Sequence, residues 1–193
     1  MLFSERGFFV PRGSDGYIDR RLCWCEKPRN SEPNQSGSID SALAAFDNEI
    51  ENNPGNALAQ VWRGLMLISL GRPAEAIPSI ERGIALSPRD WDLNIFYRSM
   101  AHAYFSLGRF DQAVTWAEKA IAHSPRYAKG YVFLAAAASL KGDQARAKSA
   151  LEEFRRLQPT YDSVAAFRAN LMPGEVRMFE ATPRFWEALQ KAG

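Results

Sequence analysis

The sequence is poor in the residues that build metal centres and disulfide frameworks. Its 193 residues include two cysteines and two histidines. Cys23 and Cys25 form a single Cys-x-Cys pair, whereas a structural zinc or iron–sulfur site needs about four ligands. The histidines, His102 and His123, lie far along the chain from that pair. We therefore expect two reduced thiols, no metal and no cofactor.

Long apolar runs and an excess of one charge are missing as well. No run approaches the ~20 apolar residues that span a bilayer. The short apolar stretch at the N-terminus is followed at once by Pro11 and Arg12, unlike a secretory signal. The 24 basic and 22 acidic residues are mixed along the chain, whereas nucleic-acid binders usually cluster their basic side chains. We expect a cytoplasmic protein that binds neither membranes nor nucleic acid.

The sequence also lacks the usual catalytic motifs: a Gly-rich phosphate loop, an HExxH pair and a nucleophile elbow. A histidine that acts as a general base needs a nucleophile or a carboxylate within reach. The sequence nominates neither for His102 or His123. We expect a protein that is not an enzyme.

What the chain does contain is an internal repeat. Turn glycines and small helix residues recur in one register with spacings of 37 and 34, and prolines that follow helical segments recur with spacings of 34, 37 and 34. These markers are Gly71, Gly108 and Gly142; Ala76, Ala113 and Ala147; and Pro54, Pro88, Pro125 and Pro159. Each unit predicts two antiparallel helices that approach closely at small side chains. The three extra residues, which lie between Pro88 and Gly108, predict one added turn at the start of a helix.

The pattern resembles the tetratricopeptide repeat family. The third unit matches at Tyr97, Met100, Ala101, Tyr104, Gly108, Ala113, Ala120 and Pro125. The fourth matches at Tyr131, Leu134, Ala135, Gly142, Ala147, Leu151 and Pro159, and the second, more loosely, at Gly64, Leu67, Ala76 and Pro88. The resemblance implies an all-α, right-handed superhelix of antiparallel helix pairs, about three and a half repeats long. Such repeats are general scaffolds that bind proteins or peptides.

The expected organisation has three parts. Residues 1–38 are an irregular leader, residues 39–159 form the repeat domain, and residues 160–193 form capping helices. Helices begin after a cap at Asp162 or Ser163 and after Thr182, with Pro183 in the first turn.

The first repeat is half present, because its helix over 39–54 has no sister: prolines and Gly37 interrupt residues 23–37. Two kinds of cover for its apolar face stay open. One is the aromatic residues of the leader, Phe3, Phe8, Phe9 and Trp24. The other is a second copy of the chain, which would give a homodimer.

The resemblance places a peptide-binding groove along the first helices of the repeats. Its expected residues are Leu58, Val61, Leu65 and Ile68; Ile95, Arg98, His102 and Phe105; and Lys129, Val132, Ala136 and Ser139. For the apolar members the alternative is the core between repeats, and for Arg98 and Lys129 it is solvated surface. Chaperone-binding relatives clamp a C-terminal carboxylate with a Lys and Asn pair, but Val61 and Leu65 stand at those places. The implied partner is a protein or peptide with an apolar strip and acidic groups.

Two other functions stay open: a sensor module that binds a small ligand, favoured by a closed pocket, and a self-assembling module. A narrower resemblance concerns residues 87–143 and the ending FWEALQKAG. They are similar to the C-terminal repeat region of bacterial class III adenylate/guanylate cyclase-type proteins and of winged-helix regulators. That resemblance implies a detached signalling module without a catalytic or DNA-binding domain.

Overall fold

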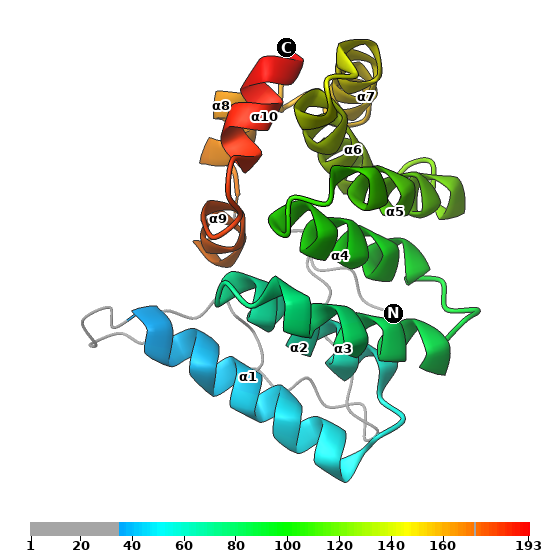
Figure 1. Ribbon diagram of the computed structural model, residues 1–193, viewed down its shortest axis with the longest axis vertical. Coiled ribbons are helices and arrows are strands. Elements are labelled where there is room, and N and C mark those ends of the chain that lie inside the picture. Colours follow the sequence, from blue (N-terminus) through cyan, green and yellow to red (C-terminus); the bar gives the residue numbers. More distant parts are fainter. Residues whose placement is uncertain (1–34, 172) are drawn as a thin grey trace.

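The computed structural model describes residues 35–171 and 173–193, and these residues form ten helices. The first is α1 (Gln35–Asn52). Three antiparallel pairs follow: α2 (Ala57–Ser69) with α3 (Pro73–Leu86), α4 (Leu93–Ser106) with α5 (Phe110–His123), and α6 (Ala128–Lys141) with α7 (Gln144–Leu157). Three short helices end the chain: α8 (Val164–Ala169), α9 (Pro173–Glu180) and α10 (Phe185–Ala192). The expected all-α stack of helix pairs is confirmed (Figure 1).

Glycine closes the first helix of each pair. Gly71, Gly108 and Gly142 have φ values of 73°, 73° and 94°, a left-handed conformation that costs glycine nothing. After Gly71 the backbone N–H of Arg72 donates to the carbonyl of Leu67 over 2.8 Å, and the N–H of Gly71 donates to that of Ile68. These two bonds satisfy carbonyls that the helix end would leave without partners. The turn glycines therefore act as the repeat pattern predicts.

Small residues form the contact between the two helices of a pair. Ala76, Ala113 and Ala147 have no exposed surface. A Cβ on Gly64 of α2 would lie 2.5 Å from Cγ1 of Ile80 in α3. The helices approach so closely that a larger side chain has no room.

The expected added turn in the third unit is wrong. α4 begins at Leu93 and has 14 residues, the same number as α6. The additional residues lie before the helix, where Oδ1 of Asp90 accepts a hydrogen bond from the backbone N–H of Asp92. The side chain of Asp92 makes no capping bond.

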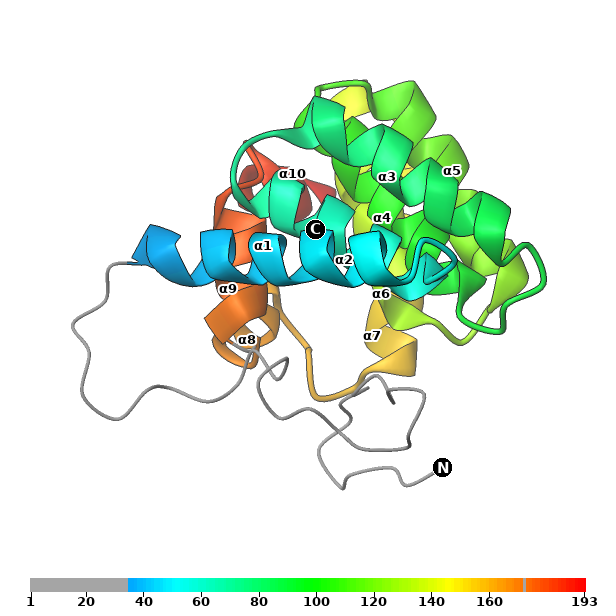
Figure 2. The same ribbon diagram turned by 90° about the horizontal axis from the view of Figure 1, so that it is seen from below.

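α1 lies across one end of the stack and packs against α2 (Figure 2). Its start at Gln35 corrects the expectation that Gly37 interrupts any helix there. The side chains of Leu43, Phe46 and Ile50 are half-buried. The four aromatic residues of the leader lie outside the described residues.

The C-terminal helices do not extend the stack. α10 packs along α6 and α9 packs against α2, so both lie beside the first helices of the pairs, away from α3 and α5 (Figures 1 and 2). Ser163 caps α8 by accepting a bond from the N–H of Ala166, as expected. Thr182 caps no helix, because α10 begins at Phe185 and the Thr182 side chain is buried.

Candidate functional site

The face of α2, α4 and α6 that is turned toward α9 and α10 is called the inner face here. These three helices carry the residues that the sequence assigns to a peptide groove, although Val61 also lies against α3, where a Cβ on Gly83 would be 2.6 Å from its Cγ2. The burial of these residues increases from the first turn of each helix onward. First-turn residues are half-buried: Leu58, Ile95 and Lys129. All deeper residues are buried: Val61, Leu65, Ile68, Arg98, His102, Phe105, Val132, Ala136 and Ser139. The inner face is therefore open only along its first-turn rim.

Two phenylalanines of the C-terminal helices are among the residues that cover this face. Phe179 of α9 and Phe185 of α10 are stacked with ring centroids 4.6 Å apart. Phe185 also meets Phe105 of α4 at 5.7 Å and Phe133 of α6 at 5.3 Å. Both covering rings are at most 1% exposed. The inner face thus binds an aromatic helical segment that belongs to the same chain.

A buried histidine connects α4 to the turn that follows α9. Nε2 of His102 lies 2.6 Å from Oγ1 of Thr182, and that hydroxyl donates its hydrogen to the carbonyl of Met178 over 2.9 Å. The hydroxyl must then accept from His102, which assigns the proton to Nε2. Complete burial, and to a lesser degree the charge of Arg98, holds the pKa of His102 well below its ordinary value of 6.5. The ring is neutral and acts as a hydrogen-bond donor.

Two nitrogen atoms next to this contact have no partner within the described residues. They are Nε of Arg98 and Nδ1 of His102. Arg98 is only 6% exposed, which corrects its alternative assignment to solvated surface. Leaving a buried polar group unpaired costs about 1–3 kcal/mol. The arrangement in which α9 and α10 cover the inner face, called the closed arrangement below, therefore leaves two buried hydrogen-bonding atoms without partners among the described residues.

A second polar contact lies at the rim. Nζ of Lys129, in the first turn of α6, forms an ion pair with the carboxylate of Glu175 in α9. The two side chains are 39% and 26% exposed. Lys129, the basic residue at the rim of the inner face, therefore already binds an acidic group of the same chain.

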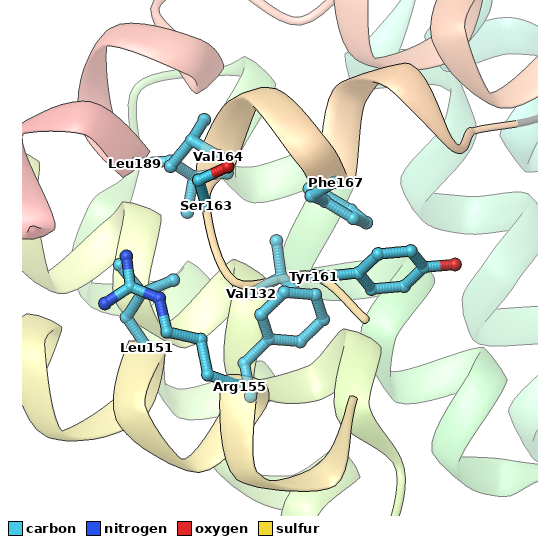
Figure 3. Close-up of a pocket in the computed structure, with 9 residues that line it drawn as sticks. Val132, Leu151, Arg155, Tyr161, Ser163, Val164, Phe167 and Leu189 are labelled. Atoms are coloured by element: carbon cyan, nitrogen blue, oxygen red, sulfur yellow. The ribbon is translucent and has the colours of Figure 1, made fainter. Parts of the chain in front are cut away.

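The hollow beside this site is too small for a small-molecule ligand. It lies between α6, α7, α10 and the segment that leads to α8 (Figure 3). Its lining is mostly apolar: Val132, Leu151, Phe154, Arg155, Tyr161, Ser163, Val164, Phe167 and Leu189. Its volume is about 10 Å³, near the space of one water, whereas ligand pockets measure about 300–1,000 Å³.

The described residues hold neither a metal centre nor a membrane span. Among them, no group of three or more His, Cys, Asp or Glu side chains is placed to hold a metal ion. Over the same part of the chain, no helix combines the length and the apolarity needed to cross a bilayer. Cys23 and Cys25 lie outside it.

Phe179 and Phe185 were not among the residues expected at the site, and Thr182 was expected as a helix cap and not as a partner of His102. Their signal was present: apolar side chains recur at 178, 179, 185, 188, 189 and 192. This spacing indicates helices with a buried face. It does not say which surface of the stack that face covers.

Comparison with known proteins assigns the stacked pairs to a family. Two tetratricopeptide repeat models match residues 35–90 and 97–127. Over the matched residues, which hold α1 to α5, the helix pairs are tetratricopeptide repeats, and α6 with α7 continues the same stacking of pairs.

Individual relatives agree with this family. A curated Hsp70-Hsp90 organizing protein of Triticum aestivum is 34% identical over 104 residues, which are 54% of this chain and 17% of that protein. This chain therefore spans about a sixth of that relative.

Two solved structures share the fold. One is MamA, with a TM-score of 0.58 and 21% identity over 82% of this chain and 91% of that one. The other is the first repeat domain of Spaghetti (RPAP3) bound to the HSP90 peptide SRMEEVD, with a TM-score of 0.53 and 24% identity over 70% and 94% of the two chains.

Proposed function

We propose that this protein is a non-enzymatic, cytoplasmic scaffold that binds another protein through the inner face of α2, α4 and α6. The observation that carries the proposal is the occupied state of that face, where Phe179 and Phe185 fill it and Glu175 meets Lys129. Such repeats are binding scaffolds in general, and the similarity to an Hsp70-Hsp90 organizing protein supports the same role.

The inner face favours an aromatic or apolar partner over a free C-terminal carboxylate. The places where chaperone-binding relatives carry the Lys and Asn of their clamp are held by Val61 and Leu65, each 1% exposed. Neither side chain can donate a hydrogen bond to a carboxylate. The acidic group of the partner binds instead at the rim, where Lys129 now holds Glu175.

Rival functions receive less support. The hollow beside α10 is too small for the ligand of a sensor module. The half-buried apolar side chains of α1 favour self-assembly only if the leader leaves them uncovered, and residues 1–34 of the leader lie outside the described residues. None of the relatives above favours the narrower likeness to cyclase-type or winged-helix regulators over a general scaffold.

The test is a capture experiment on matched variants. Ile95→Arg places a charge on the half-buried rim of α4, and Glu152→Arg places the same charge on the exposed side of α7. After capture from a lysate of the source cell, we expect a partner that Ile95→Arg loses and Glu152→Arg retains. Equal recovery by both variants, with folding shown by circular dichroism, would rule out the inner face as the binding surface.

A further inference from the structure

Residues 173–192, which hold α9, the turn after it and α10, are called the C-terminal segment. The segment presents three kinds of group to the inner face. Aromatic rings at 179 and 185 fill the apolar part, Thr182 accepts from His102, and Glu175 pairs with Lys129. These are the groups that a partner helix would need to bind the same surface. In its chemistry, the segment has the features of a ligand.

The segment depends on this surface for its own structure. α9 and α10 have eight residues each, and isolated helices of that length are not stable in water. Ordering twenty residues opposes the closed arrangement through lost conformational entropy. The segment is therefore helical because the inner face holds it, not because its sequence is strongly helical.

Three features weaken the closed arrangement locally. Arg184, between α9 and α10, has a φ of 60°, a left-handed conformation that is unfavourable for a residue with a Cβ. Nε of Arg98 and Nδ1 of His102 are buried without a partner in the described part of the chain. The left-handed residue belongs to the segment itself, and the two unpaired nitrogen atoms belong to α4, the helix that the segment covers. Each of them lowers the stability of the contact between segment and stack, which favours an arrangement that can be exchanged.

From these observations we propose that the C-terminal segment is an internal occupant of the partner surface, which a partner replaces with an aromatic-rich helical segment of its own. The proposal rests on the proposed function and names the partner class. The partner carries one aromatic side chain on each of two short helices, with a carboxylate about one turn before the first, as Glu175 precedes Phe179 in α9. Extended polar peptides do not fill this surface, because six of its nine deeper residues are apolar.

The test uses the full chain and a fluorescein-labelled synthetic peptide of residues 173–193. Phe185→Ala weakens the internal occupant without altering the inner face, since Phe185 belongs to the segment. We expect the variant to bind the peptide at least tenfold more tightly than wild type in fluorescence anisotropy. Arg184→Gly, which relieves the left-handed residue, should bind it more weakly than wild type. A peptide with both phenylalanines changed to alanine is the control and should not bind.

Several results would overturn the proposal. One is a folded Phe185→Ala chain that binds the peptide no better than wild type. Another is equal binding of the control peptide. If Phe185→Ala does not fold, Thr182→Val replaces it with the same expectation, because it removes the contact with His102 and the bond to the carbonyl of Met178 but leaves both phenylalanines in place. If the peptide test fails but Ile95→Arg still abolishes capture of the partner, the inner face remains the binding surface and only the exchange is refuted.

Discussion

Replacing Gly83 by alanine has two opposite effects on stability: a gain in helix propensity and a loss from overpacking. Gly83 lies inside α3, and glycine in a helix interior is less favourable than alanine by about 1 kcal/mol. From helix propensity alone, Gly83→Ala would stabilise the protein. The packing of α3 against α2 predicts the reverse.

The geometry at Gly83 leaves no space for a methyl group. A Cβ there would lie 2.6 Å from Cγ2 of Val61 and 2.8 Å from the carbonyl oxygen of Ala57. The valine could rotate, but the carbonyl belongs to the first turn of α2 and moves only if the helix moves. Overpacking of this kind costs about 1–3 kcal/mol, and a backbone contact belongs at the upper end. After subtraction of the propensity gain, we expect a net loss of about 2 kcal/mol.

Thermal and urea unfolding measure this loss. For a chain of this size, 2 kcal/mol lowers Tm by about 4–8 °C. Gly130→Ala is the matched control, because a Cβ there meets the side chain of Ile121 at 3.0 Å and other atoms only at 3.7 Å. The control should stay within about 1 kcal/mol of wild type. If Gly83→Ala proves as stable as wild type, α2 and α3 do not approach as described.

Further variants test other contacts. Ala113→Leu should lose about 1–3 kcal/mol in urea unfolding by overpacking the α4–α5 contact, where Ala113 has no exposed surface; an unchanged midpoint would contradict this. Thr182→Val should lose about 1–3 kcal/mol, because Nε2–H of His102 is left buried without an acceptor. If Thr182→Val causes the same loss in a chain that already carries His102→Phe, the loss has another cause. Because the pKa of His102 is held well below 6.5, the unfolded chain binds a proton below that pH and the folded chain does not. The free energy of unfolding should therefore fall as the pH drops below 6.5, by up to about 1.4 kcal/mol per pH unit. Burial and the nearby Asp90 raise the pKa of Asp92 to about 6, so its contribution has the opposite sign and rises as the pH falls from 6 toward 3.8. Asp92→Asn should therefore add at most about 3 kcal/mol at pH 7 and steepen the loss in acid; a variant with the wild-type pH profile would refute the assignment.

The repeat fold could be predicted because its determinants are local and recur. The left-handed turn at Gly71 and the close contact at Ala113 each depend on one small residue at a fixed distance from its neighbours. Three such markers in one register leave little freedom in the helix pairs between them. The prediction of an added turn at the start of α4 was wrong. Three inserted residues give the same spacing of markers whether they extend the helix or precede it.

The candidate site could be predicted only in part. The positions of the inner-face residues follow from the repeat register, and all lie on α2, α4 and α6. Their burial does not follow, since it depends on where the C-terminal segment packs. Arg98 shows the difficulty: a charged residue in the sequence suggests solvent, yet its exposed fraction in the fold is only 6%.

The contact between α9 and α2 has a consequence for how the chain folds and unfolds. In a simple stack each repeat touches only its neighbours, so stability adds along the array and the ends can fray independently. Here residues 173–180 pack against residues 57–69, which joins one end of the stack to the other. Fraying of α2 would also release the segment that covers α4 and α6. The closed protein should therefore melt as one cooperative unit, while a chain whose segment has been displaced should behave as a linear array with broader, local transitions.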